Sequence, residues 1–265
     1  TEIALKLTTK LIITRSIKMI PKIIHYCWFG GNDKSIELIK SIQSWKKVLN
    51  DYKLIEWNES NFDVNNLLFT RENYKRKKYA FVSDVARLDA LYEYGGIYLD
   101  TDVIVKKSFN PFLNHKLFLG MMFDDSIGTA VIASEKNNRV IYNLRKLYEN
   151  MDVTNTPNND IFTKYFIDNY NEFILGNIYQ VLNDSTIIYP KEYFERPTYN
   201  KNKGYSIHKN LGSWHDGIQN NNIVRYVLKR ILGPVLISKI QNFRIIKKAA
   251  YYDVYLEHKK IRKKL

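Results

Sequence analysis

The chain alternates short apolar runs with segments of helical periodicity. Strand-like runs rich in β-branched and aromatic residues occupy residues 22–29, 53–57, 97–99, 116–123, 130–133 and 186–189. Apolar residues recur at helical spacing in residues 35–49, 84–94, 139–148 and 161–170. Strands that alternate with helices predict an α/β fold, here a Rossmann-like, mainly parallel sheet flanked by helices.

The helix predicted after Ser83 carries two residues of opposite charge in its first turn. Ser83 is a candidate N-cap, and Gly95 with Gly96 should end the helix, because glycine tolerates the left-handed conformation. Asp84 and Arg87 are three residues apart and therefore neighbours on the helix surface. One interpretation is a weak surface ion pair. The other is that Asp84 accepts hydrogen bonds from sugar hydroxyls while Arg87 contacts phosphate or sugar oxygens.

An acidic pair, Asp100 and Asp102, directly follows the apolar run at residues 97–99. Side chains two residues apart in an extended chain point the same way. Hard oxygen ligands at a strand end suit Mg²⁺ or Mn²⁺ bound to a diphosphate. A pair of this spacing is expected about once by chance in a chain with this many aspartates, so a solvated turn is the alternative.

Composition predicts a folded protein with a large core. Hydrophobic residues make up 45% of the chain, and no window approaches 18 consecutive apolar residues. The single cysteine, Cys27, excludes an internal disulfide and fits a reducing, cytoplasmic compartment. Residues 1–18 lack the features of a signal peptide. We expect them to be a leader or added upstream segment, with Met19 as the natural start.

The positive charge is concentrated at the C-terminal end. Residues 224–265 hold twelve lysines and arginines and two acids, which gives +10 of the net +14. Apolar residues between 224 and 235 fall on one helical face, and Pro234 predicts a kink or an end there. We therefore expect a catalytic domain at residues 19–223 and a basic, amphipathic helical tail at 224–265. Such a tail fits an anionic inner membrane surface; a helix packed on the domain is the alternative.

Four separated segments resemble one known family. Residues 83–103 (SDVARLDALYEYGGIYLDTDV) look like the signature of the family 32, DXD-containing glycosyltransferases, which include bacterial capsular polysaccharide sugar transferases and Golgi mannosyltransferases. Residues 20–31 and 57–63 resemble earlier segments of the capsular members, and residues 189–214 resemble their C-terminal signature. The likeness covers residues 19–216 in order, which is more specific than the acidic pair alone.

The resemblance implies an A-type glycosyltransferase fold, a nucleotide-sugar donor and Mn²⁺ or Mg²⁺. It implies catalytic roles for Asp84, Arg87, Asp100 and Asp102, and a metal bound by Asp102, His208 and Asp100. The donor would be bound by residues from three regions of the chain, namely His25, Tyr26, Trp28, Phe29, Asp84, Arg87, Asp100, Ser213 and Trp214.

The implied activity is a retaining transfer of a hexose, with uridine diphosphate favoured as the carrier. The acceptor would be a saccharide or a lipid-linked oligosaccharide in surface or capsular polysaccharide synthesis, at the inner face of the cell membrane. A polyanion- or nucleic-acid-binding protein is one alternative, given a pI near 9.5. The basic residues cluster in the tail and no nucleic-acid motif occurs, so no nucleic-acid partner is expected. A metal-dependent phosphohydrolase is another, with Asp124 and Asp125 as the only further candidate ligands.

Overall fold

The computed structural model of the chain describes residues 19–152, 156–210, 223–246 and 250–264, and of residues 223–232 and 245 only the backbone. Its elements, in chain order, are β1 (Ile23–Cys27), α2 (Ile36–Val48), β2 (Lys53–Trp57), α3 (Leu68–Lys75), α4 (Tyr79–Tyr94), β3 (Gly96–Leu99), β4 (Val103–Val105), the 3-10 helix η1 (Asn110–Phe112), β5 (Leu117–Phe123), β6 (Ser126–Ser134), α5 (Arg139–Leu147), α6 (Asn158–Asn169), β7 (Gln180–Val181), β8 (Thr186–Tyr189), β9 (Ser206–His208), α7 (Ile223–Ile246) and α8 (Tyr252–Arg262).

The central sheet of the described chain has seven strands in the order β2-β1-β3-β6-β5-β8-β7. β2, β1 and β3 are parallel, as are β5 and β8, and these five strands share one direction. β6 and β7 run antiparallel to their neighbours. The sheet is mixed but mostly parallel, with helices on both faces, which confirms the predicted α/β, A-type fold. The antiparallel β5–β6 hairpin is not foreseen by the sequence pattern.

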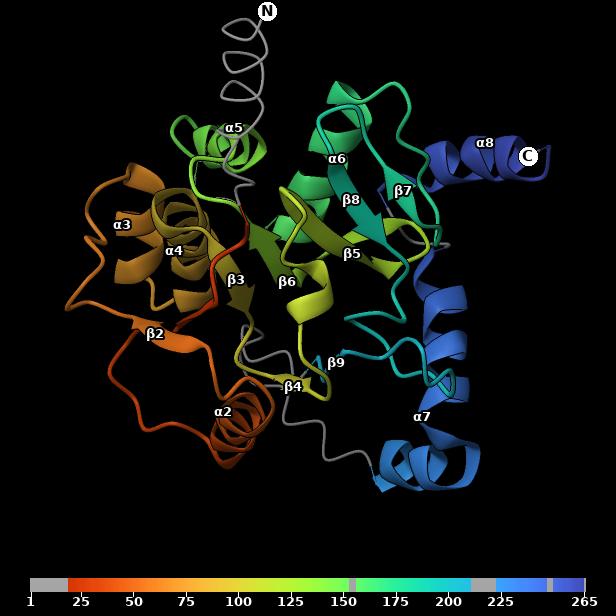
Figure 1. Cartoon of the computed structure of the whole chain (residues 1–265), viewed down its shortest axis with the longest axis horizontal. Coiled ribbons are helices and arrows are strands. Elements are labelled where there is room, and N and C mark those ends of the chain that lie inside the picture. The colour runs from red at the N-terminus through yellow and green to blue at the C-terminus, as the bar shows by residue number, and fades with distance from the viewer. Residues whose placement is uncertain (1–18, 153–155, 211–222, 247–249, 265) are drawn as a thin grey trace, which may run out of the picture.

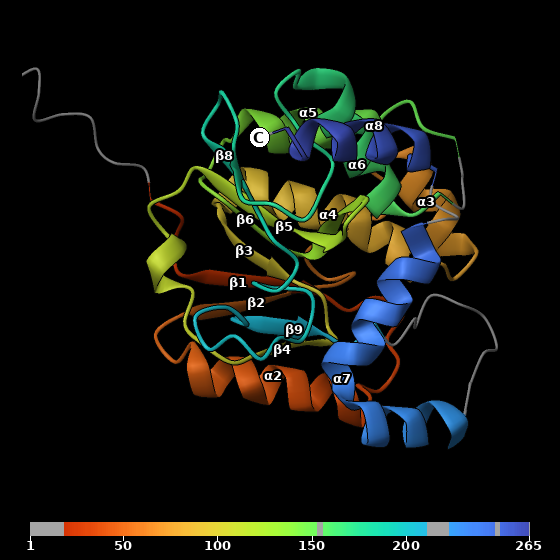
Figure 2. The ribbon, with the colours of Figure 1, turned by 90° about the vertical axis from the view of Figure 1, so that its right-hand side faces the viewer.

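Two apolar clusters sandwich the sheet. Helices α3–α6 cover one face, while α2 and the small two-stranded sheet of β4 and β9 lie on the other (Figures 1 and 2). β3 shows how alternation serves both clusters: Tyr98 packs with the α4 side, and Ile97 and Leu99 pack with the α2 side. Successive side chains of a strand point to opposite faces, so a strand buried on both faces is apolar throughout.

Helix α2 fixes the segment that follows the acidic pair. The indole of Trp45, fully buried, donates its Nε1 hydrogen to the carbonyl of Val103 at 2.8 Å. One residue earlier, the hydroxyl of Ser44 accepts from the backbone N–H of Val105 at 3.0 Å. These bonds satisfy backbone groups of β4 that a two-stranded sheet leaves unpaired. They hold β4, and with it the preceding loop, at a fixed place on the domain.

The start of α4 differs from the prediction. Ser83 is not its N-cap: the helix begins one turn earlier at Tyr79, and the Ser83 hydroxyl donates to the Tyr79 carbonyl at 3.0 Å. A serine inside a helix can bond back to the preceding turn, which hides it from a capping rule. The predicted end is confirmed, since Gly95 closes the helix at φ 65°. A Cβ at Gly95 would lie 2.7 Å from the backbone nitrogen of Lys136, so glycine is required there.

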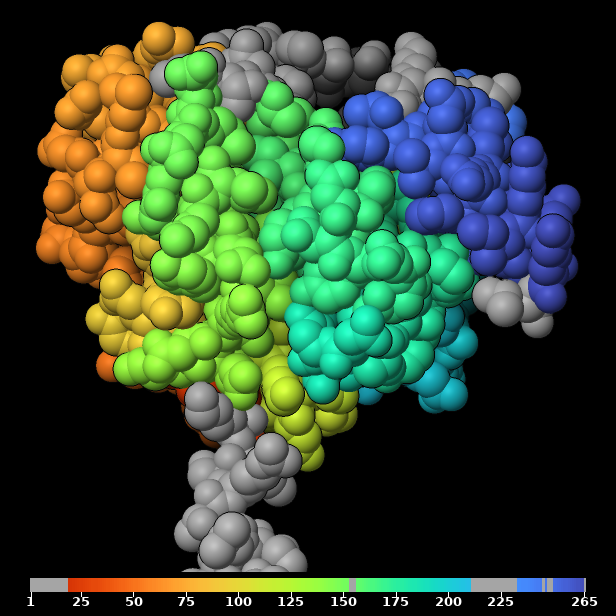
Figure 3. Space-filling model, turned by 90° about the horizontal axis from the view of Figure 1, so that it is seen from above, coloured from red at the N-terminus to blue at the C-terminus, as the bar shows by residue number. Residues whose placement is uncertain are grey.

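The basic C-terminal region packs on the domain. α7 breaks at Gly233, which has φ 72°, directly before Pro234, so the predicted kink is confirmed. Ile246 and Tyr255 are buried in the same apolar cluster as α4, and His258 Nδ1 accepts from the Leu175 N–H at 2.7 Å. Figure 3 shows the C-terminal residues (blue) lying against the green and teal part of the domain. For α8, the structure therefore agrees with the alternative of a helix packed on the domain. Residues 1–18, and the side chains of the apolar face predicted from residue 224 to 231, lie outside what is described.

His25 belongs to the core, contrary to the predicted donor contact. It is fully buried because β1 lies between β2 and β3. Its Nδ1 accepts from the Trp57 indole at 3.1 Å, and its Nε2 contacts the Gly95 carbonyl at 2.8 Å. A carbonyl only accepts, so Nε2 carries the proton and the ring is neutral. Burial lowers the pKa of His25 from 6.5 to about 4, against the opposing effect of the Gly95 hydrogen bond.

We expect His25 to make the fold sensitive to acid. Between pH 6.5 and pH 4 the unfolded chain binds a proton at this histidine and the native protein does not. The contribution of His25 to stability is therefore constant above pH 6.5 and decreases as the pH drops towards 4, by up to about 3 kcal/mol. Urea unfolding across this range measures the slope. His25→Gln should flatten it, and an unchanged slope in that variant would contradict the assignment.

Candidate active site

Arg87 stands at the centre of a buried polar network on α4. Its Nη2 lies 3.0 Å from Asp84 Oδ1 and 3.4 Å from Asp100 Oδ1. Its Nη1 donates to the Thr129 carbonyl at 3.0 Å, and the guanidinium lies 4.4 Å from the centre of the Tyr98 ring. Arg87 is only 5% exposed. The predicted neighbour pair of Asp84 and Arg87 is therefore an internal bridge between α4 and the end of β3, and the surface interpretation is wrong.

Two residues that the sequence analysis missed complete this network. The side-chain amide of Asn158, at the start of α6, donates to Asp84 Oδ1 at 2.7 Å. The hydroxyl of Thr129 on β6 in turn donates to Asn158 Oδ1 at 2.9 Å. A buried carboxylate needs such partners, because an unpaired charge in a dry interior is costly. Neither residue lies in a recognisable motif; the only sequence signal is a polar residue at the start of a helix.

Burial competes with charge at these carboxylates. Burial raises the pKa of Asp84 to about 7, with Asp100 adding to the rise and Arg87 opposing it. Burial also raises the pKa of Asp100, while Arg87 and His208 act to lower it. Burial alone would lower the pKa of Arg87, but Tyr98, Asp100 and Asp84 outweigh it and raise the pKa. One guanidinium is thus shared by two carboxylates. Negative charge therefore remains at Asp100 to attract a further cation.

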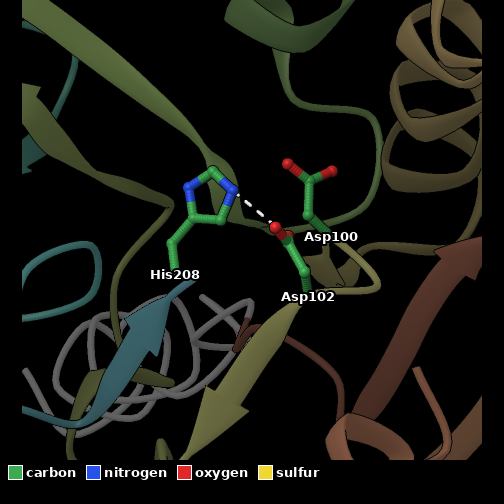
Figure 4. A group of neighbouring side chains, drawn as sticks. All are labelled: Asp100, Asp102 and His208. Atoms are coloured by element: carbon green, nitrogen blue, oxygen red, sulfur yellow. Dashed lines mark ion pairs between the residues drawn. The ribbon is translucent and has the colours of Figure 1, made fainter. Parts of the chain in front are cut away.

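Asp100, Asp102 and His208 form a cluster with the composition of a metal site. One ligand atom from each lies within 4.8 Å of the others, and His208 Nε2 is 3.1 Å from Asp102 Oδ1 (Figure 4). The pairing of β4 with β9 sets His208 opposite Val103, directly beside Asp102. The side chains of Asp100 and Asp102 are 25% and 18% exposed, so the cluster opens to a ligand from outside.

Glu195 holds His208 in place from the opposite side. Its Oε2 accepts from His208 Nδ1 at 2.8 Å, and its Oε1 accepts from the backbone N–H of Ala130 at 3.3 Å. The side chain is 1% exposed and lies over Gly128, where a Cβ would come within 2.4 Å of Glu195 Oε1. Burial acts to lower the pKa of His208, but Glu195 and Asp102 raise it to about 10.

These residues fit a divalent cation. Two carboxylates and an imidazole nitrogen are ligands that Mn²⁺ accepts, and a carboxylate on the far ring nitrogen is the usual support for a metal-binding histidine. Because Glu195 can only accept a hydrogen bond, Nδ1 keeps its proton. The proton that the raised pKa holds on Nε2 must leave when a cation binds there. The predicted metal set of Asp102, His208 and Asp100 is thereby brought together from the loop between β3 and β4 and from the distant strand β9.

The other predicted donor residues are placed differently. Tyr26 is 8% exposed and its hydroxyl donates to Glu56 at 2.7 Å, while Phe29 is 4% exposed and packs edge-on against Phe62. In the structure these two side chains, like His25, contact protein groups, and their contact with a donor stays a prediction. Trp28 is partly exposed, and its Nε1 donates to the Asn32 carbonyl at 2.8 Å. Ser213 and Trp214 lie outside the described residues.

Comparison with known proteins identifies the family. Residues 35–119 match the family model of the glycosyltransferase sugar-binding region containing the DXD motif, which includes Asp100 and Asp102. An uncharacterised glycosyltransferase of Acanthamoeba polyphaga mimivirus is 30% identical over 215 residues, covering 74% of this chain and 84% of that protein. The chain belongs to the DXD-containing glycosyltransferases. The acidic pair of this glycosyltransferase is thus the motif that gives the family its description, and the family uses a nucleotide-sugar donor and an acceptor.

Other relatives are more distant. Inositol phosphoceramide mannosyltransferase 1 of Schizosaccharomyces pombe is 28% identical over 113 residues, and this glycosyltransferase spans 34% of that protein's length. Among solved structures, the PaToxG glycosyltransferase is 22% identical with a TM-score of 0.45, covering 61% of this chain and 76% of that one. The galactosyltransferase LgtC is 14% identical with a TM-score of 0.42, covering 77% and 94% respectively.

We expect Glu195→Gln to weaken Mn²⁺ binding about 10- to 100-fold, which is the usual cost of losing an outer-shell partner. Glutamine keeps the shape and can still accept from the Ala130 N–H, but it no longer fixes the His208 ring as a carboxylate does. Isothermal titration with Mn²⁺ measures the change without reference to turnover. Glu257→Gln, on the exposed face of α8, is the control. If Glu195→Gln lowered thermal stability and left Mn²⁺ affinity intact, Glu195 would have only a structural role.

Proposed function

We propose that this glycosyltransferase is metal-dependent and transfers a hexose, with retention of anomeric configuration, from a nucleotide diphosphate donor that carries uridine. The observation that supports this most directly is the cluster of Asp100, Asp102 and His208 within 4.8 Å, beside the buried Arg87. Membership of the DXD-containing glycosyltransferases favours this function over the two alternatives. One was a polyanion- or nucleic-acid-binding protein, suggested by composition, and the other was a metal-dependent phosphohydrolase, suggested by the acidic pair alone.

In this proposal each side chain has a role that follows from its exposure. Asp100 and Asp102 reach the opening and hold the cation with His208, and that Mn²⁺ or Mg²⁺ ion, when bound, supplies positive charge to the departing diphosphate. Asp84 and Arg87 are 7% and 5% exposed, and the donors of Arg87 are directed at protein acceptors. We therefore assign Arg87 the task of orienting Asp84 and Asp100, in place of the direct phosphate contact expected from the sequence.

The transfer itself is proposed as a same-face substitution. The bond from the anomeric carbon to the diphosphate oxygen breaks as the bond to the acceptor oxygen forms, and the acceptor proton passes to an oxygen of the departing diphosphate. Positive charge develops at the anomeric carbon, as in other glycosyl transfers. Proton NMR of the first product gives its anomeric configuration. An inverted product, or a glycosyl-enzyme adduct in mass spectrometry, would contradict this step.

We further propose a saccharide or lipid-linked acceptor in the synthesis of a surface polysaccharide, on the cytoplasmic side of the membrane. A lipid acceptor has a precedent in one relative, which is named an inositol phosphoceramide mannosyltransferase. A panel of nucleotide sugars with Mn²⁺, read by thermal shift and by sugar release, tests donor and metal together. A ligand that binds only the native state raises the apparent melting temperature. No shift and no release with any nucleotide sugar would sink the proposal.

The second half of α7 supports docking on an anionic membrane surface. Leu236, Ile240 and Phe243 are 44%, 39% and 65% exposed at helical spacing, with Lys239 and Arg244 close by along the helix. No helix in the described part of the chain is long and apolar enough to span a bilayer. An exposed apolar stripe with flanking cations is typical of a helix that lies in the interface.

Replacing both Leu236 and Phe243 by serine should reduce co-sedimentation with phosphatidylserine vesicles several-fold, because binding scales with apolar area and charge. Vesicles of phosphatidylcholine alone should bind weakly in both proteins. Tyr142→Ser, an exposed aromatic on α5, is the matched control. Equal sedimentation of the double variant and the unmodified protein would show that this face does not dock.

A further inference from the structure

A cavity with several charged side chains in its lining lies outside the metal cluster. It measures about 310 Å³ and is lined by residues of 191–203 and of the second half of α7, which lie side by side in Figures 1 and 2. Among its described lining residues are four cations and one acid, and these are Lys191, Arg196, Lys203, Lys239 and Glu192. Neither the predicted donor residues nor the metal ligands line it, so it is separate from the cluster of Asp100, Asp102 and His208.

Arg196 gives this cavity its chemical character. The residue is 6% exposed, its guanidinium lies 4.0 Å from the centre of the Phe123 ring, and its Nε donates to the Met122 carbonyl at 3.0 Å. Its Nη2 is buried and has no hydrogen-bond partner in the described part of the chain. A buried charged donor without an acceptor costs free energy, and native proteins rarely keep one without a reason.

The surrounding charges leave the cavity positive. Lys191 is neutralised by an ion pair with Asp124, and the Glu192 carboxylate accepts from the Asn177 amide at 3.1 Å. For Lys203 and Lys239 the described residues provide no ion pair within 4.0 Å. Two ammonium groups therefore stand at the rim and a buried guanidinium within. That arrangement of positive charge attracts an anion, and phosphate is a common anionic partner of arginine and lysine side chains.

The chain itself ties this cavity to the active site. Arg196 directly follows Glu195, whose carboxylate holds His208. Consecutive Cα atoms are about 3.8 Å apart, so the two side chains leave neighbouring points of one backbone. The loop that carries Glu195 to the metal cluster therefore carries Arg196 to the cavity.

We propose that the cavity binds a phosphate group of the acceptor, held by Arg196 within and by Lys203 and Lys239 at the rim. Its role as part of an acceptor site rests on the proposed function, whereas phosphate binding does not. The bound phosphate balances the positive charge of these three side chains. A sugar or lipid hydroxyl attached to that phosphate is the group that would accept the transferred sugar.

Isothermal titration in EDTA tests phosphate binding with the metal-dependent donor site switched off. The probes are inorganic phosphate, a hexose 1-phosphate and glycerophosphoinositol, which is a soluble phosphodiester headgroup. The probe that binds most tightly identifies the kind of molecule that carries the phosphate group. We expect Arg196→Gln to weaken binding at least tenfold and Lys203→Gln/Lys239→Gln to weaken it several-fold. The Lys203→Gln/Lys239→Gln variant changes only residues at the rim, so the test does not depend on whether Arg196→Gln folds. Asp102→Asn, and the charge-matched Lys46→Gln/Lys53→Gln on α2 and β2, should bind as the unmodified protein does.

Donor hydrolysis measured on the same preparations separates the two proposals. If nucleotide sugars are hydrolysed but no probe binds, or if the cavity variants bind every probe unchanged, the phosphate site is refuted and the proposed function stands. If the cavity variants lose phosphate binding but no donor is hydrolysed, the site stands and its assignment to an acceptor falls.

Discussion

Asp102→Asn will abolish Mn²⁺-dependent sugar release, with a loss of at least about 10²–10³-fold, while the protein remains folded. Removing one group that stabilises developing charge has a cost of this order. Asp102 Oδ1 lies 3.1 Å from His208 Nε2, so the two share one small volume with Asp100. An amide of the same shape offers a neutral oxygen in place of an anionic one. The cation then loses one of its two carboxylates.

The measurement is hydrolysis of the nucleotide sugar across a Mn²⁺ titration, with thermal unfolding in EDTA as the check on folding. The side chain of Asp102 is 18% exposed at a loop, so its replacement should change the apo melting temperature little. Asp253→Asn, an exposed aspartate in the first turn of α8, is the matched control and should retain full activity. Turnover of Asp102→Asn equal to that of the control would remove Asp102 from the metal site.

Arg87→Met will destabilise the fold by about 3–5 kcal/mol, the usual cost of leaving buried charges without their partner. Methionine fills much of the volume, so the loss comes from electrostatics more than from a cavity. Asp84 and Asp100 would face each other across the vacated guanidinium, with Asp84 7% exposed. Urea unfolding in EDTA measures the change in the free energy of unfolding.

A double-mutant cycle with Asp84→Asn sharpens this result. Residues in contact are coupled, so the double variant should lose at least about 1 kcal/mol less than the sum of the single losses. Arg71→Met is the control, because Arg71 pairs with Glu72 at 3.6 Å on the surface of α3 and its side chain is 44% exposed. Its expected cost is under about 1 kcal/mol. Equal losses for Arg87→Met and Arg71→Met would show that the buried network contributes nothing special to stability.

Local patterns were sufficient for much of the fold. The runs at residues 53–57 and 186–189 match β2 and β8 to the residue, because β-branched and aromatic runs between turn residues have few other uses. Elements without a hydrophobic period were not predicted. β4 and β9 are three residues each and are stabilised by pairing with each other, so neither shows in the sequence alone. The start of α4 was misplaced, because Ser83 has the right chemistry for a cap and is used inside the helix.

The sequence by itself determined the residues whose chemistry is local. Asp100 and Asp102 follow one strand, and Asp84 and Arg87 share one helical turn, so spacing alone makes neighbours of each pair. Only the tertiary structure decided that Arg87 joins the two pairs, that Glu195 orients His208, and that His25 is a core residue. Those outcomes depend on which strands pair and which faces are covered. Such long-range contacts leave no period or motif in the chain, because the partners are fixed by packing and not by sequence distance.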